Sequence, residues 1–167
     1  MAIAPLESGS YLRSAAQIVQ LNVSEGGVPK LPIGRVIVDE LGIVGDKHRD
    51  REHHGGPERA LCLYACELIE ALRQEGHPIV AGGAGENVTT RGLDWSRLVR
   101  GRKLLLGAVL AEVTDWAVPC RTIAGCFDGG AFTRASQKVH PGWSRAYARV
   151  LQGGVLAVGD PITFAGE

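Results

Sequence analysis

Apolar and polar residues alternate in several short stretches of the chain, a pattern typical of β-strands with one buried face. Residues 16–24 (AQIVQLNVS) alternate and are rich in β-branched side chains, and residues 34–46 (GRVIVDELGIVGD) repeat the pattern up to a Gly-Asp turn. Residues 103–118 (KLLLGAVLAEVTDWAV) carry the strongest strand signal, and Gly107 divides them into a hairpin or a bulged strand. These stretches predict strands separated by turns.

One segment changes its periodicity along its length. Residues 59–76 (RALCLYACELIEALRQEG) begin with an apolar run that ends at Tyr64 and continue with apolar residues at helical spacing. Gly76 is a natural end for such a helix. We therefore expect a buried strand followed by a helix, and this division separates Cys62 from Cys66.

The C-terminal part adds further strands and settles the expected fold class. Residues 154–164 (GVLAVGDPITF) predict a strand pair around a Gly-Asp-Pro turn, and residues 144–151 (SRAYARVL), after a Pro-Gly turn, predict either a short helix or a strand. Many short strands with one clear helix favour a mainly β, β-rich α+β fold, expected to be a β-barrel with a few short helices. The length predicts a single domain over residues 1–167.

Composition narrows the classes of function. The chain has 18 basic and 18 acidic residues, so its formal net charge gives no reason to expect nucleic acid or an anionic membrane as a partner. Its amino terminus lacks a basic leader and no apolar run reaches the length of a membrane span, so a cytoplasmic protein is expected. In that reducing compartment the four cysteines are expected to be free thiols.

Two loops carry candidate binding residues. Residues 45–61 (GDKHRDREHHGGPERAL) crowd histidines and charges before a buried strand, and they could present His53, His54 and Arg59 to a ligand or form a solvated loop. Residues 81–92 (AGGAGENVTTRG) do not match a dinucleotide-binding fingerprint. Their free backbone N–H groups could bind an anion, with Glu86 and Asn87 holding the edge of a heterocycle, or they could form a plain turn before a strand at 87–90.

The segment WAVPCRTIAGC (116–126) carries the candidate reactive group. Pro119 ends the preceding strand, and Cys120 follows it beside Arg121. A guanidinium next to a thiol favours the thiolate, which is both the nucleophile and the metal-binding form. A buried, inert thiol and a pairing with Cys126 are the alternatives that the residues leave open.

Taken together, these segments resemble the MOSC domain, named after the carboxy-terminal domain of molybdenum cofactor sulfurases. The resemblance rests on GDKHRDREHHGGPERALCLY, GAGENVTTRGLD, GAVLAEVTDWAVPC and HPGWSRAYARVLQGGVLAVGDPI, in the order and spacing of the family. It covers about residues 34–164 and implies a stand-alone bacterial-type member similar to the hydroxylaminopurine reductases. The family implies a β-rich, barrel-like domain that binds the pterin-based molybdenum cofactor or carries activated sulfur.

The resemblance also implies roles for individual residues. Cys120 matches the cysteine of the Pro-Cys motif, which supplies a thiolate ligand to molybdenum in the reductases of the family. His53, His54 and Arg59 match the charged loop that would face the phosphate or the pterin of the cofactor. Glu86 and Asn87 match the Gly-Glu-Asn motif that would contact the heterocycle.

The function that we expect is a molybdenum-dependent oxidoreductase that reduces N-hydroxylated small molecules, with Cys120 as the metal ligand. The cysteines lack the spacing of an iron–sulfur site, so the electrons would come from a partner protein. The alternative is a non-catalytic sulfur carrier that holds a persulfide on Cys120. Its partner would be a cysteine desulfurase.

Overall fold

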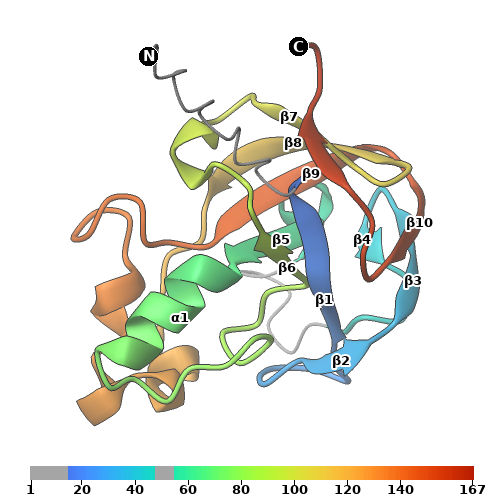
Figure 1. The fold of residues 1–167 in the computed structure, drawn as a ribbon. Helices are drawn as coiled ribbons and strands as arrows, with labels where there is room; N and C mark the ends of the chain where they lie inside the picture. Colours follow the sequence, from blue (N-terminus) through green and yellow to red (C-terminus); the bar gives the residue numbers. More distant parts are fainter. Residues whose placement is uncertain (1–14, 48–54) are drawn as a thin grey trace, which may run out of the picture.

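Two β-sheets form the framework of the computed structural model, which describes residues 15–47 and 55–167. The larger sheet has eight strands, in the spatial order β11 (Ile162–Phe164), β7 (Lys103–Leu106), β8 (Val109–Trp116), β9 (Ala146–Gln152), β5 (Leu61–Ala65), β6 (Val88–Arg91), β1 (Gln17–Val23) and β2 (Leu31–Ile33) (Figure 1). The smaller sheet contains β10 (Gly154–Ala157), β3 (Arg35–Asp39) and β4 (Gly42–Ile43). The prediction of a β-rich α+β fold is confirmed.

The larger sheet curls back on itself but keeps two edges. Its neighbouring strands are antiparallel except β5 and β6, which are parallel. The start of β1 reaches the start of β11 through hydrogen bonds from the Ile18 N–H to the Asp160 carbonyl (2.9 Å) and from the Ile162 N–H to the Ala16 carbonyl (2.8 Å). Among the described strands the pairing still ends at β11 and β2, so the expected barrel is a curled sheet without full closure.

The main hydrophobic core lies inside this curl. Alternate residues of β7 and β8 point into it, as the sequence pattern requires. All five residues of β5 are buried, because its two faces pack against different clusters. Its Leu61 and Leu63 belong to the main core, and Tyr64 belongs to a second cluster under α1.

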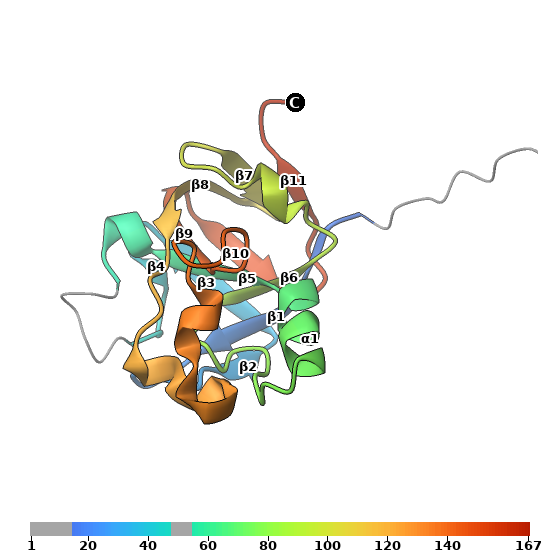
Figure 2. The ribbon, with the colours of Figure 1, turned by 90° about the vertical axis from the view of Figure 1, so that its left-hand side faces the viewer.

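The second cluster joins α1 (Cys66–Gln74) to a run of three short 3-10 helices, η3 (Arg121–Cys126), η4 (Asp128–Gly130) and η5 (Phe132–Ala135). In Figure 2, α1 and the orange 3-10 helices lie in the lower half of the view, below β7 and β8. Tyr64, Leu72 and Ile123 contribute buried side chains from three different elements. In the part of the chain that the structure describes, no helix is both long and apolar enough to cross a membrane.

Most strands lie where the sequence pattern predicts them. The predicted strand-to-helix division falls between Ala65 and Cys66, and β7 and β8 form the predicted hairpin around Gly107. Residues 144–151 contain a strand, β9, and not a helix.

Two expectations about the strands need correction. The strands β10 and β11 occur within residues 154–164 as predicted, but they pair with β3 and β7 instead of with each other. The strand β2 was not predicted, because its three residues are exposed and include Pro32, so they show no alternation.

Candidate functional site

A cavity of about 790 Å³ lies where the end of β8 meets the start of β9. Five other described segments complete its wall: the loop between β1 and β2, the segment between β4 and β5, the start of β5, the turn before β6 and the segment that leads from β8 into η3. Its lining combines thiols, cations and apolar groups: Gly27, Val28, Lys30, Lys47, Gly55, Arg59, Cys62, Ala84, Gly85, Asn87, Asp115, Trp116, Val118, Cys120, Thr122, Ile123, Arg145 and Tyr147. A cavity of this size is ordinary for a cofactor or small-molecule site.

Cys120 lies on the wall of this cavity and is half-buried. It follows the segment after β8 and is the residue from which η3 begins, with an extended backbone (φ −136°, ψ 176°). Its carbonyl accepts a hydrogen bond from the Ile123 N–H (3.1 Å), which holds the first turn of η3. The predicted reactive thiol therefore faces a ligand-sized space and is not a packed core thiol.

The arginine beside Cys120 in the sequence does not share this wall. Arg121 is exposed and does not line the cavity, whereas Arg59 and Arg145 do. The positive charge that Cys120 meets within the cavity thus comes from residues distant in the sequence.

The charged loop of residues 45–61 is described only in part. His53 and His54 lie outside the described residues. Arg59 ends η1 (Pro57–Arg59) and lines the cavity, with its guanidinium 5.4 Å from the centre of the Tyr147 ring. The structure therefore brings Arg59 to the same cavity as Cys120.

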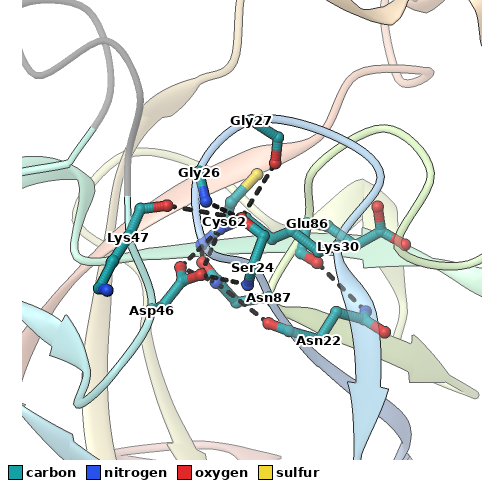
Figure 3. A network of polar contacts seen from close by, with 10 residues as sticks. All are labelled: Asn22, Ser24, Gly26, Gly27, Lys30, Asp46, Lys47, Cys62, Glu86 and Asn87. Atoms are coloured by element: carbon teal, nitrogen blue, oxygen red, sulfur yellow. Dashed lines mark hydrogen bonds and ion pairs between the residues drawn. The ribbon is translucent and has the colours of Figure 1, made fainter.

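Asn87 joins three segments of the wall. Its Oδ1 accepts a hydrogen bond from the Cys62 N–H (3.1 Å), and its Nδ2 donates to Asp46 Oδ2 (2.8 Å) and to the Asn22 carbonyl (3.4 Å). Figure 3 shows how these groups converge from β1, β5 and the turn before β6. Asn87 lines the cavity while holding its wall together, and one lone pair of Oδ1 remains for a ligand.

Lys30 and Asp46 form a buried ion pair next to Asn87. The Nζ atom of Lys30 lies 2.6 Å from both carboxylate oxygens of Asp46, and the two side chains are only 6% and 3% exposed. Asp46 also accepts a hydrogen bond from the Ser24 N–H (2.9 Å). The pair fixes the loop between β1 and β2 against the wall.

Glu86 lies behind the cavity wall and not on it. Its side chain is fully buried, and Oε1 accepts hydrogen bonds from the Gly82 N–H (2.6 Å) and the Thr89 hydroxyl (3.0 Å). Oε2 has no partner in the structure, and burial raises the pKa of the carboxyl. In Figure 3 the carboxyl points away from Asp46 and Lys47. Of the Gly-Glu-Asn motif, Asn87 thus reaches the cavity, and Glu86 supports the turn beneath it.

Several lining residues were missed by the sequence reading, among them Cys62, Arg145 and Tyr147. Burial raises the pKa of Cys62 to about 11 and that of Tyr147 to about 12, and the positive charge of Arg145 acts against both shifts. Both groups therefore keep their protons at neutral pH. Cys62 looked like an ordinary residue of a buried strand, and no local motif marks Arg145.

All four cysteines are free thiols, as the composition predicted. Cys126 packs against the second cluster and does not line the cavity. Burial raises its pKa. Cys120 is thus distinguished from Cys126 by its access to the cavity.

The lining can hold a ligand by several kinds of contact. A thiol offers a soft metal ligand, arginines bind oxyanions, and apolar side chains such as Trp116 and Ile123 exclude water. Residues 15–47 and 55–167 contain no cluster of three or more His, Cys, Asp or Glu side chains that could hold a metal ion.

Comparison with known proteins agrees with this fold. The family model of the MOSC domain matches residues 50–163. The chain is 31% identical to protein YiiM of Escherichia coli over 129 residues, which is 74% of this chain and 57% of that protein. It is 28% identical to the uncharacterized protein YflK of Bacillus subtilis over 137 residues, which is 81% of this chain and 61% of that protein.

The fold has a solved counterpart as well. The crystal structure of YiiM from Geobacillus stearothermophilus superposes with a TM-score of 0.69 and 27% sequence identity, covering 90% of this chain and 75% of that chain. The matched region spans only about 57% to 61% of the length of the two curated relatives. The family match extends over more than half of this chain and includes Arg59, Asn87 and Cys120. The chain belongs to the MOSC domain family.

Proposed function

We propose that this chain binds a molybdenum cofactor of the molybdopterin type in the cavity, with Cys120 as the protein ligand to the metal, and reduces N-hydroxylated small molecules. The observation that carries the proposal is the position of the Cys120 thiol on the wall of a cavity of about 790 Å³ that also contains two arginines. Membership of the MOSC family supports the choice of cofactor.

The residues of the cavity fit such a cofactor chemically. A cysteine thiolate is a soft ligand and suits a metal that already carries a pair of dithiolene sulfurs. Arg59 and Arg145 supply positive charge for the phosphate of the cofactor. The free lone pair of Asn87 can accept a hydrogen bond from a heterocycle.

The cofactor, when bound, supplies the two-electron chemistry that removes the oxygen of an N-hydroxyl group. The balance is R–NHOH + 2 e⁻ + 2 H⁺ → R–NH₂ + H₂O, with the electrons delivered by a donor protein. Cys120 would hold the cofactor, and Trp116 and Ile123 would exclude water from the space around it. Tyr147 keeps its phenolic proton, because burial raises its pKa to about 12.

A reductase assay tests this function. Protein purified from a host that makes the cofactor is expected to reduce an aromatic amidoxime with a chemically reduced dye as the electron donor. Cys120→Ser should lower the rate at least about a hundredfold, and Cys126→Ser, at a thiol outside the cavity, should leave it within about twofold. Equal rates for the wild type and Cys120→Ser would contradict the proposal.

The second candidate is a sulfur carrier that holds a persulfide on Cys120 and receives the sulfur from a cysteine desulfurase. The half-exposed thiol favours this candidate, because a sulfur-transfer partner must reach it from solvent. Mass spectrometry after incubation with a desulfurase and cysteine separates the two functions. A gain of one sulfur atom on Cys120 in a protein without bound metal would favour the carrier.

A further inference from the structure

Among the described residues, Arg145 is a buried cation without an ion pair. Its side chain lies on the wall of the cavity, and the residue is only 5% exposed. Nη1 donates a hydrogen bond to the Ala84 carbonyl (2.6 Å). Within residues 15–47 and 55–167 no carboxylate forms an ion pair with this guanidinium. A buried charge without a counter-ion in this part of the chain is costly, which indicates that the site is built to receive a negative charge.

Two acidic groups, the Glu86 carboxyl and the Cys62 thiol, interact with Arg145 without forming an ion pair in the described part of the chain. Glu86 acts on Arg145 electrostatically, but its Oε1 is engaged by Gly82 and Thr89. The Cys62 thiol lies close enough to interact with Arg145, yet its pKa of about 11 keeps it neutral. The Cys62 thiol therefore supplies no negative charge at neutral pH, and among the described residues neither carboxyl oxygen of Glu86 bonds the guanidinium.

The other cations of the cavity are engaged or exposed. Lys30 is paired with Asp46, and Lys47 lies in an exposed pair with Glu25. Arg59 lies over the Tyr147 ring. The lining acid Asp115 pairs with Arg100 on the outside of the cavity. The lining is therefore positive as a whole, with Arg145 as its most buried charge.

The backbone around Arg145 is fixed, so the guanidinium is held in place before a ligand arrives. The Arg145 carbonyl accepts a hydrogen bond from the Ala117 N–H (2.9 Å), and the Ser144 hydroxyl donates to the Ala117 carbonyl (2.8 Å). These bonds tie the start of β9 to the segment that leads to Cys120. The turn on the other side approaches the guanidinium at Gly85, where a Cβ atom would lie 4.0 Å from Nη1 of Arg145 and 3.0 Å from Cγ1 of Val28.

We propose that Arg145 is the anion-binding residue of this cavity and holds a phosphate-type oxyanion of the bound ligand. A guanidinium carries five N–H donors in a planar fork, and the bond to Ala84 uses one of them. A phosphate accepts the paired N–H groups of such a fork. The inference rests on the proposed function for the location of the site, but inorganic phosphate tests it without a cofactor or an activity.

The experiment measures phosphate binding to protein made in a host that lacks molybdopterin. Isothermal titration with inorganic phosphate, and with chloride at matched ionic strength, is applied to the wild type, Arg145→Gln, Arg145→Lys and Arg121→Gln. Arg145→Gln is expected to weaken phosphate binding at least about tenfold, because charged hydrogen bonds are lost. Arg145→Lys should recover part of it, and Arg121→Gln, which removes an exposed neighbouring charge, should bind like the wild type.

Thermal unfolding without ligand separates anion binding from a purely structural role. An arginine that serves a ligand leaves the ligand-free protein little changed or more stable when it is replaced, so Arg145→Met should keep or raise Tm and lose the phosphate-induced rise. Wild-type phosphate affinity in Arg145→Gln, or phosphate binding that is absent from the wild type, would overturn the inference. A wild type that binds phosphate but never contains molybdenum would contradict the proposed function alone.

A last comparison identifies the source of the oxyanion. If the cofactor supplies it, the cofactor-loaded protein no longer binds free phosphate at Arg145. If a substrate supplies it, the loaded protein still binds phosphate with an affinity that depends on Arg145. Both results support the anion site, and binding that is independent of Arg145 in both preparations overturns it.

Discussion

The ammonium group of Lys30 lies 2.6 Å from both carboxylate oxygens of Asp46, and both side chains are almost completely buried. This pair connects the loop between β1 and β2 to the segment that follows β4, beside the amide of Asn87. Because Lys30 lines the cavity and Asp46 holds it in place, the shape of the cavity depends on the pair.

Removal of one partner of this pair should therefore lower the free energy of unfolding. Lys30→Met leaves the Asp46 carboxylate buried with hydrogen bonds but without this cation, and the free energy of unfolding is expected to fall by about 3 kcal/mol. Urea unfolding measures the loss. Lys47→Met is the matched control, because its pair with Glu25 is exposed and should contribute less than about 1 kcal/mol. Equal losses for the two variants would contradict the role of the buried pair.

Glu86 should make stability depend on pH. Because burial raises its pKa above the ordinary value of 4.5, the folded protein keeps a proton over a pH range in which the unfolded chain releases it. The resulting stabilisation is fully present below pH 4.5 and is lost as the pH rises through the raised pKa, with a slope of up to about 1.4 kcal/mol per pH unit.

The variant Glu86→Gln isolates this contribution. It keeps an oxygen acceptor for the Gly82 N–H and cannot titrate. Urea unfolding of both proteins from pH 4.5 upward should show wild-type stability falling relative to that of the variant. A constant difference over this range would show that Glu86 has the same pKa in both states.

Much of the fold follows from local pattern. The alternation in β7 and β8 and the change of period between β5 and α1 can be read directly, because each element has one buried face. The strand β2 was not predicted, because its three residues are exposed and include a proline, so they show no alternation of apolar and polar positions. The pairing partners of β10 and β11 were not predicted, because strand pairing depends on tertiary packing and not on the local sequence of each strand.

The residues of the candidate site were likewise predictable only in part. Cys120, Arg59 and Asn87 lie in motifs that can be recognised along the chain, and the structure brings all three to one cavity. Arg145 and Cys62 carry no such signal, because an arginine at the start of a strand and a cysteine inside one are both common. Only the arrangement of β5, β8 and β9 places them beside Cys120.

The two thiols of the cavity should differ in reactivity. Cys62 is buried with a pKa of about 11, so about one molecule in a thousand carries its thiolate at pH 8. Cys120 is half-buried at the wall of the cavity. Iodoacetamide at pH 8, followed by peptide mass spectrometry, should label Cys120 well before Cys62. Labelling of both at one rate in the folded protein would contradict the described burial.

Metal analysis of the purified protein is the sharpest test of the proposal that Cys120 holds a molybdenum cofactor in the cavity. Wild type, Cys120→Ser and Cys126→Ser are produced in one cofactor-competent host and compared for molybdenum and pterin content and for Tm. We expect close to one molybdenum per chain in the wild type and in Cys126→Ser, and at least about a tenfold loss in Cys120→Ser with little change in the Tm of the metal-free protein. Wild-type protein without molybdenum or pterin, or equal molybdenum in Cys120→Ser, would contradict it.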